Sequence, residues 1–212
     1  MTYEELIDTI EELRKTYNAF AVAIDGMTSA GKTTLAAHLS KKYGAPVIHL
    51  SDFLLPKTER KAGWEDTPAG EVDFERFDEE IVTPWMEKKP LVYSVVDPAS
   101  GELIERRALP DGQMFLIEGT YCLHPCIRDF YDLRLFLRID AAEQTRRLTA
   151  GGKTPDTAAL ARENAYFVTY MTDLLSDGVL EGDIPLPDPA SAPAPESAPA
   201  PAKNTPDSAP DA

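Results

Sequence analysis

Residues 26–34 constrain this chain more than any other segment. Their sequence, GMTSAGKTT, matches the pattern G-x-x-x-x-G-K-[ST] at every fixed position. The apolar residues 19–25 before them predict a buried strand, and residues 32–43 predict a helix. In such a strand–loop–helix unit, glycines let successive backbone N–H groups turn toward phosphate oxygens, and the helix N-terminus adds its dipole. The segment, called the P-loop below, therefore predicts a binding site for a nucleoside triphosphate.

Two side chains of the P-loop have predicted roles in phosphoryl transfer. Lys32 is expected to reach the β- and γ-phosphates of ATP, and the Thr33 hydroxyl is expected to ligate Mg²⁺. The predicted cofactors are therefore ATP and Mg²⁺. The residues expected to surround the phosphates are Gly26, Met27, Thr28, Ser29, Ala30, Gly31, Lys32, Thr33 and Thr34.

Strands alternate with helices along the rest of the chain. Further buried strands are predicted at residues 46–50, 113–119 and 132–139. Helices are predicted at residues 3–16, with Thr2 and Glu5 as a capping box, and at 74–88, 141–149 and 157–176. Residues 91–96 and 102–109 predict a β-hairpin arm around DPASG, and residues 54–72 are polar and irregular. The alternation predicts an α/β fold with a mostly parallel sheet covered on both faces.

Composition excludes several classes of protein. The net charge of −15, from 21 basic and 36 acidic side chains, argues against sequence-independent binding to nucleic acids, which needs a basic surface. Two cysteines make no disulfide framework, and no apolar run approaches the roughly 20 residues that span a bilayer. The acidic, amphipathic N-terminus is unlike a secretory signal. We therefore expect a cytoplasmic protein with no membrane partner, and we leave a homo-oligomer open.

The C-terminal segment differs from the rest of the chain. Nine of the 18 prolines lie from Ile184 onward, where Ile184 and Leu186 are the only large apolar side chains. Such a segment cannot bury enough apolar surface to offset the entropy of ordering. We predict one folded domain over residues 1–180, which contains the P-loop and begins with a helix within residues 1–18. Residues 181–212 are predicted to form a disordered, acidic, Pro/Ala-rich tail. The tail is either a spacer or a docking segment for a proline-recognising partner.

Acidic side chains follow two of the predicted strands. Asp52 comes just after residues 46–50, and Glu118 ends residues 113–118. In parallel sheets, chemistry gathers at the carboxyl ends of the strands. A carboxylate there could hold Mg²⁺ or take the proton of an acceptor hydroxyl, so both are candidate metal ligands and Asp52 is the candidate base. The alternatives are a turn cap for Asp52 and a salt-bridge partner for Glu118.

A basic segment, RRLTAGGK, could form a mobile lid over the phosphates. Arg146 and Arg147 open this segment, and Arg162 lies on the helix that follows. An arginine can stabilise the charge that spreads over the phosphoryl oxygens during transfer, and Gly151 and Gly152 would make the lid flexible. The alternative is an ordinary solvated helix face, and the sequence does not decide between the two.

Several segments together resemble the uridine kinase and nicotinamide riboside kinase group of P-loop kinases. The resemblance covers roughly residues 19–170. It rests on IDGMTSAGKTTLA, HLSDFLLP, GEVDFERFD, FLIEGTYCLHP and the arginine pair. The P-loop specifies only the superfamily, whereas SDFLLP and IEGTYCLHP at these separations narrow the resemblance to this group.

The resemblance implies a five-stranded parallel sheet with a short lid and a β-hairpin arm that holds the acceptor. It implies transfer of the γ-phosphoryl group of ATP to a primary hydroxyl, typically of a nucleoside. By position, Asp73 would bind the ribose hydroxyls, and Glu118 would be the metal-associated acid. Tyr93 and Asp97 lie in the arm that would line the acceptor pocket.

Two positions depart from the pattern of that group. The group has its proposed base two residues before Phe53, where this chain has Ser51, and Asp52 falls one residue later. On a strand, a one-residue shift points the side chain to the other face. In the arm, Val96 and Gly101 replace a tyrosine and a histidine of uridine kinases. The acceptor is therefore left as a nucleoside-like or sugar-like alcohol.

Other chemically capable side chains are predicted to be structural. Cys122, His124 and Cys126 do not converge as metal ligands at this spacing, and both cysteines read as small buried thiols. His38 is expected at the surface or in packing, and His49 is expected to be structural although it ends a strand near the site.

Two functions remain open at this point. The first is an ATP- and Mg²⁺-dependent small-molecule kinase. The second, suggested by Ser51 in the place of the base, is a nucleotide-binding regulatory protein with little turnover. A GTPase is disfavoured because the N-K-x-D and D-x-x-G motifs are missing.

Trp64, in the irregular segment 54–72, could close over an acceptor or pack against the sheet.

Overall fold

A five-stranded parallel sheet forms the centre of the computed structural model. The structure describes residues 1–56, 58–97, 100, 102–151, 154–182 and 184–186. The strands of this sheet are β1 (Phe20–Gly26), β2 (Val47–His49), β5 (Met114–Glu118), β6 (Leu133–Arg138) and β7 (Gly178–Glu181). A separate antiparallel hairpin, the arm, consists of β3 (Val92–Val96) and β4 (Leu103–Ala108).

Helices connect these strands. The α-helices are α1 (Tyr3–Thr16), α2 (Lys32–Tyr43), α3 (Phe74–Phe77), α4 (Thr83–Met86), α5 (Ala141–Ala150) and α6 (Thr157–Tyr170). Short 3₁₀ helices are η1 (Leu50–Phe53), η2 (Trp64–Asp66) and η4 (Arg128–Phe130). The π-helical turn η3 (Asp78–Val82) joins α3 to α4, so residues 74–86 are continuously helical, close to the helix predicted at 74–88.

The strand order is β2-β5-β1-β6-β7, and every neighbouring pair is parallel. This order confirms the predicted fold class. Strand β1 lies in the middle, with β5 on one side and β6 on the other, so the chain leaves it at the point where the strand order reverses. In open α/β sheets, ligands bind outside the carboxyl ends of the strands at such a point. The P-loop begins there, at Gly26.

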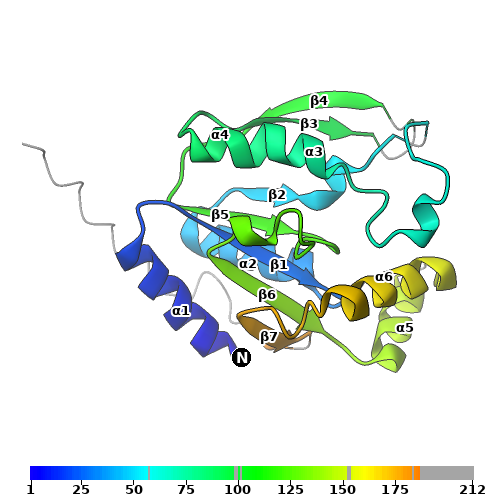
Figure 1. Cartoon of the computed structure of the whole chain (residues 1–212). Coiled ribbons are helices and arrows are strands. Elements are labelled where there is room, and N and C mark those ends of the chain that lie inside the picture. Colours follow the sequence, from blue (N-terminus) through cyan, green and yellow to red (C-terminus); the bar gives the residue numbers. More distant parts are fainter. Residues whose placement is uncertain (57, 98–99, 101, 152–153, 183, 187–212) are drawn as a thin grey trace, which may run out of the picture.

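Helices lie on both sides of the sheet (Figure 1), and an apolar cluster packs against each face. On one face, α1 and α2 pack against β1 through buried residues such as Leu6, Ile10 and Leu35. The predicted capping box of α1 is confirmed, because Thr2 and Glu5 cap each other's backbone. On the other face, α3, η3, the arm and α6 pack around Phe53 and Phe77. Burial of these apolar side chains is the main favourable term in folding.

The end of the domain differs from the prediction. The helix predicted at 157–176 stops at Tyr170, because Met171 adopts a left-handed conformation with φ of 49°. The chain then turns and forms β7, which pairs with β6 and supplies the fifth strand of the sheet. Its four residues are too short for a periodic signal, and Leu174 and Leu175, which prolonged the apparent helix, are exposed.

Packed structure extends beyond the domain end that was predicted at residue 180. Ile184 and Leu186 pack against the cluster on the α1–α2 face, although both fall within the segment predicted to be a tail. The remaining tail residues, 187–212, lie outside the described residues. No helix in the described part of the chain has the length and apolar character that crossing a membrane requires.

Candidate active site

The P-loop depends on backbone conformations that favour glycine. Gly26 has φ of 134°, and a Cβ there would lie 2.1 Å from the carbonyl oxygen of Leu137 on β6. Gly31, which precedes α2, has φ of 101°. Between them Ser29 has φ of 66°, an uncommon conformation for a residue with a side chain. The two fixed glycines of the motif therefore have a steric reason, and the loop holds strain at Ser29.

Lys32 lies across the mouth of the P-loop. Its Nζ donates hydrogen bonds to the carbonyl oxygens of Gly26 at 2.7 Å and Met27 at 3.0 Å, and to the Thr120 hydroxyl at 3.1 Å. Burial lowers the pKa of this ammonium group, and the charges of Asp25, Glu163 and Glu118 oppose that shift. The side chain is thus held at the place where the motif predicts contact with phosphates.

Thr33 and Glu118 come together at the start of α2 and the end of β5. The Thr33 hydroxyl lies 3.2 Å from both carboxylate oxygens of Glu118. His49, at the end of β2, donates from Nδ1 to Glu118 at 2.5 Å, and this hydrogen bond raises the pKa of His49. A hydroxyl and a carboxylate are oxygen ligands of the kind that Mg²⁺ prefers, so the side chains present fit the ion. His49, expected to be structural, holds the Glu118 carboxylate through this hydrogen bond.

Asp52 faces the arm. Residues 50–53 form the 3₁₀ helix η1, so the alternation of a strand does not apply, and Asp52 is buried while Ser51 is exposed. The Asp52 Oδ2 accepts a hydrogen bond from the Tyr93 hydroxyl at 3.2 Å and forms a 3.0 Å ion pair with Arg107. The structure therefore joins the candidate base to one predicted acceptor residue. Arg107, on β4, was not predicted.

Tyr93 is fully enclosed at this point. Its ring stacks on Phe53 at a centroid distance of 5.2 Å, and burial raises the pKa of its hydroxyl to about 12. A phenol with so high a pKa stays protonated at neutral pH and can only donate to Asp52. Tyr93 therefore holds the Asp52 carboxylate by this hydrogen bond, and its predicted contact with an acceptor stays a prediction.

Asp73 caps the N-terminus of α3. Its Oδ1 accepts from the backbone N–H of Arg76 at 3.0 Å, which satisfies one of the free donors of that helix. The Arg76 guanidinium also donates to the carbonyl oxygens of Ser94 at 2.6 Å and Asp52 at 2.9 Å, and lies over the Phe53 ring. One cation therefore connects α3, η1 and the arm.

The end of the arm is described only in part. The Asp97 N–H donates to the Glu102 carbonyl oxygen at 2.8 Å, and its Oδ2 accepts from the Ser100 N–H at 3.1 Å. Asp97 therefore closes the turn of the arm in this structure, and its predicted contact with an acceptor stays a prediction. Gly101, where uridine kinases have a histidine, lies outside the described residues.

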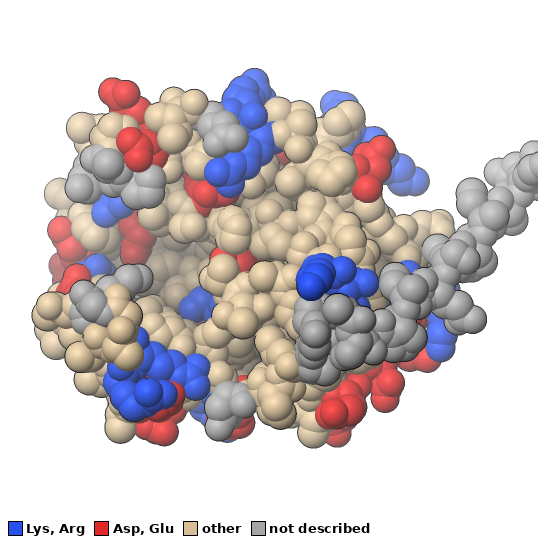
Figure 2. All heavy atoms as spheres, turned by 180° about the vertical axis from the view of Figure 1, so that it is seen from behind, with Lys and Arg blue, Asp and Glu red and all other residues tan. Residues whose placement is uncertain are grey.

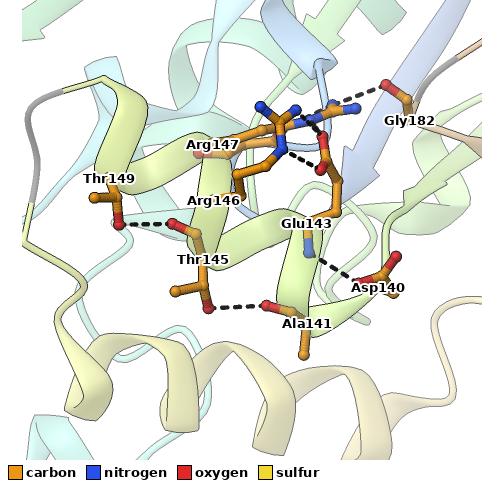
Figure 3. Close-up of polar contacts among 9 residues, drawn as sticks. Asp140, Ala141, Glu143, Thr145, Arg146, Arg147, Thr149 and Gly182 are labelled. Carbon is orange, nitrogen blue, oxygen red and sulfur yellow. Dashed lines mark hydrogen bonds and ion pairs between the residues drawn. The ribbon is translucent and has the colours of Figure 1, made fainter.

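The predicted lid arginines lie on α5 (Figure 3). Both guanidinium groups pair with Glu143, at 2.6 Å from Arg146 and 2.5 Å from Arg147, and these bonds lower the pKa of Glu143 to about 2. Arg147 also donates to the carbonyl oxygens of Ser29 at 3.3 Å and Gly182 at 2.9 Å. Arg147 thus reaches the P-loop, whereas Arg146 is mostly exposed. Gly151 ends α5, and Gly152 lies outside the described residues.

Asp25, the last residue before the P-loop, is a buried carboxylate that sequence reasoning missed. It accepts hydrogen bonds from the backbone N–H groups of Gly26, Tyr121 and Leu123 and from the Tyr166 hydroxyl, at 2.6 to 3.1 Å. Burial raises its pKa to about 6 even though these donors lower it. A carboxylate in the otherwise apolar run AVAID was the available signal. Asp25 joins β1, the loop after β5, and α6.

Glu163 was also missed. It lies on α6, and its buried carboxylate accepts hydrogen bonds from both the backbone N–H and the hydroxyl of Thr28 in the P-loop. Gln144 on α5 supports it with a 3.1 Å hydrogen bond. The signal was its spacing, because Glu163 shares a helix face with the buried Tyr166. An isolated glutamate in a helix is otherwise typical of a solvated surface.

The other histidines and the cysteines considered in the sequence make structural contacts in this fold. His124 stacks on Phe74 at 4.2 Å, and its Nδ1 accepts from the Cys126 N–H. Cys122 is buried as predicted, but Cys126 is exposed, so the prediction of a buried thiol was wrong there. His38 is packed inside, hydrogen-bonded to the Tyr3 hydroxyl at 2.7 Å.

Trp64 joins the irregular loop to α6. Its ring lies between the guanidinium groups of Arg60 at 4.6 Å and Arg162 at 5.2 Å. Neither reading of Trp64 from the sequence described this arrangement. Arg162, on the helix that follows the predicted lid segment, is therefore placed against the loop that carries Trp64.

Seen from behind, the molecule is hollowed, and both basic and acidic side chains lie in the hollow (Figure 2). Elsewhere on this face the two signs are interspersed rather than gathered into areas of one charge. A depression of about 340 Å³ beside Arg147 and Gly182, and another of about 210 Å³ lined by Ala30, Gly31 and Thr34, adjoin the P-loop.

Comparison with known proteins places the fold. No protein-family model matches the chain, and no curated protein matches it. Among solved structures, it is similar to a protein provisionally described as a uridine kinase from Bacillus stearothermophilus, with a TM-score of 0.61 and 22% identity over 83% of this chain and 99% of that one. It is equally similar to one provisionally described as a fructose transport system kinase from Silicibacter sp. TM1040, with a TM-score of 0.61 and 22% identity over 85% and 99%. The chain therefore has the fold of the P-loop kinases, as its resemblance to that group implied.

Proposed function

We propose that this protein is an ATP-dependent kinase that phosphorylates a primary hydroxyl of a nucleoside-like or related small molecule. The observation that carries the proposal is the convergence at one end of the sheet. There the P-loop, with Lys32 and the Thr33–Glu118 pair, lies at the same sheet end as the Asp52 carboxylate. Phosphate binding, metal binding and proton removal are the three tasks that phosphoryl transfer sets.

The P-loop side binds and orients the triphosphate. Backbone N–H groups of the P-loop and the Lys32 ammonium hold the phosphates, and Arg147 stands beside the depressions that could take the nucleoside part. Thr33 and Glu118 would hold Mg²⁺, which when bound neutralises charge on the phosphates. His49 keeps the Glu118 carboxylate turned toward Thr33.

The opposite side binds the acceptor. Asp73 would accept hydrogen bonds from acceptor hydroxyls, and Asp52 would take the proton of the reacting hydroxyl. The acceptor oxygen then bonds to the γ-phosphorus, the bond from that phosphorus to the β–γ bridging oxygen breaks, and its electron pair stays on ADP. Within the described part of the chain, both side-chain hydrogen bonds of Asp52 reach Oδ2, so Oδ1 is the oxygen for this proton.

A second function is favoured by the ion pair between Asp52 and Arg107. The Arg107 guanidinium group occupies one oxygen of the candidate base, and Ser51 cannot replace that base near neutral pH. The protein could then bind nucleotides for regulation with little turnover.

One assay separates the two functions. The protein is incubated with ATP, Mg²⁺ and a panel of nucleosides and sugar alcohols, and ADP formation is measured. The kinase predicts turnover that depends on an acceptor and falls by about 10²-fold or more in Lys32→Ala. Lys41→Ala, an exposed lysine on the same helix, is the matched control and should keep full activity. Tight ATP binding without turnover on any acceptor would favour the regulatory function.

A further inference from the structure

Glu163, on α6, is hydrogen-bonded to Thr28 of the P-loop. Its side chain is only 3% exposed, and both carboxylate oxygens lie 3.0 Å from the Thr28 nitrogen. The same carboxylate accepts from the Thr28 hydroxyl. Gln144 donates to Glu163 and also to the Thr28 carbonyl oxygen, each at 3.1 Å. Two helices, α5 and α6, therefore hold one P-loop residue by its backbone N–H, its carbonyl and its hydroxyl.

These bonds flank the strained point of the loop. Ser29, with φ of 66°, follows Thr28 directly, and its carbonyl oxygen accepts from Arg147. A left-handed conformation is unfavourable for a residue with a side chain and persists only where its surroundings enforce it. Thr28 on one side and the Ser29 carbonyl on the other are both fixed by side chains from outside. The bends that direct the following N–H groups inward are thus set by α5 and α6.

The charge of Glu163 argues against a role through electrostatics. A carboxylate beside a triphosphate repels it, so its charge alone would weaken ATP binding. A buried carboxylate at this place needs another reason, and its bonds to Thr28 provide one. We propose that Glu163 is a positioning residue that holds the P-loop in its phosphate-binding shape, acting through Thr28. The inference rests on the proposed binding of ATP.

If Glu163 acted only through its charge, its removal would strengthen ATP binding, whereas loss of a positioning residue would weaken it. Calorimetry of ATP binding in the presence of MgCl₂ measures this change. Glu163→Ala removes both the charge and the bonds, and we expect about tenfold to a hundredfold weaker binding. Glu163→Gln removes the charge but keeps an acceptor for the Thr28 N–H, and we expect it to recover most of the affinity. Leu148→Ala, which truncates a buried apolar side chain of α5, is the control for general loss of stability.

Thermal unfolding and steady-state kinetics complete the test. We expect Leu148→Ala to lower the melting temperature and leave ATP affinity unchanged. In turnover assays, Glu163→Ala should raise the KM for ATP and leave the KM for the acceptor unchanged. Unchanged or tighter ATP binding by folded Glu163→Ala would overturn the proposal, as would a loss of ATP affinity in Leu148→Ala as large as the loss in Glu163→Ala. If the unaltered protein bound no ATP, the proposed function would fall first, and this inference with it.

Discussion

The proposed nucleotide side and the proposed acceptor side of this molecule are built in different ways. The nucleotide side centres on nine consecutive residues whose shape comes from backbone conformation, with support from α5 and α6. The acceptor side is assembled from η1, α3 and the arm, and its central ion pair joins residues 55 positions apart. Binding of a common ligand needs only a local motif, whereas the choice of a particular acceptor depends on contacts between distant segments.

The largest expected effect tests whether the acceptor side is catalytic. Asp52→Asn keeps the shape but loses the base, so we expect kcat to fall about 10²–10⁴-fold with little change in ATP affinity. Ser51→Ala alters an exposed side chain and should change kcat less than twofold. Turnover measurements with saturating ATP check both, and the reverse order of the two effects would refute the placement of the base at Asp52.

Asp25 joins the P-loop to the loop after β5 and to α6, so its loss should disturb all three segments at once. Asp25→Asn faces four donors with only one acceptor oxygen and places an NH₂ group against an N–H. We expect the free energy of unfolding to fall by about 3 kcal/mol. Denaturant unfolding measures it. Tyr166→Phe, which removes only one of the donors, should cost about 1 kcal/mol, and equal losses in both variants would contradict this account.

Lowering the pH should reduce the free energy of unfolding through His124, which packs against both α3 and α6. His124 stacks on Phe74 of α3 and meets Tyr170 of α6 edge-on at 4.9 Å. Burial lowers its pKa to about 4, so between that value and its usual 6.5 the unfolded chain binds more protons. This contribution to stability is complete above pH 6.5 and is lost as the pH falls toward 4.

A substitution isolates this acid effect. Allowing for solvent screening, the loss amounts to about 2 kcal/mol. His124→Phe keeps the ring and has no proton to bind, so its free energy of unfolding should depend less on pH between 7 and 4. Parallel pH profiles for the two proteins would exclude His124 as the cause.

Asp73 allows acceptor binding to be separated from folding. Asparagine caps helices about as well as aspartate, so Asp73→Asn should preserve the melting temperature. It removes the charge that would attract acceptor hydroxyls, and we expect the KM for the acceptor to rise about tenfold, or 1.4 kcal/mol. The KM for ATP should not change. A rise in both KM values would show that the two sides are not separable here.

The smallest effect is expected at the C-terminus. Deletion of residues 187–212, a segment with few groups able to bury apolar surface, should change the free energy of unfolding by less than about 0.5 kcal/mol. Ile184→Ala with Leu186→Ala should cost more, because both side chains pack against the core. Thermal unfolding of the two proteins compares them, and a larger loss from the deletion would assign the tail a structural role.

Features of the proposed nucleotide side could be predicted from the sequence more completely than those of the proposed acceptor side. The P-loop, its flanking strand and helix, and the sheet class were predicted, because a motif and apolar periodicity are local signals. Strand β7 was not, because four residues give no period and Leu174 and Leu175 imitated a helix. Arg107 and Glu163 could not be assigned, because their roles arise only when β4 meets η1 and α6 meets the P-loop.

Arg76 has a consequence for how specificity can change in this fold. Its guanidinium group bonds to carbonyl oxygens of η1 and of the arm while its backbone is capped by Asp73. An arm exchanged for one of another length would lose this shared anchor unless the replacement offered a carbonyl at the same place. New acceptor preferences should therefore emerge through coordinated replacements across all three segments, with single exchanges showing strong epistasis.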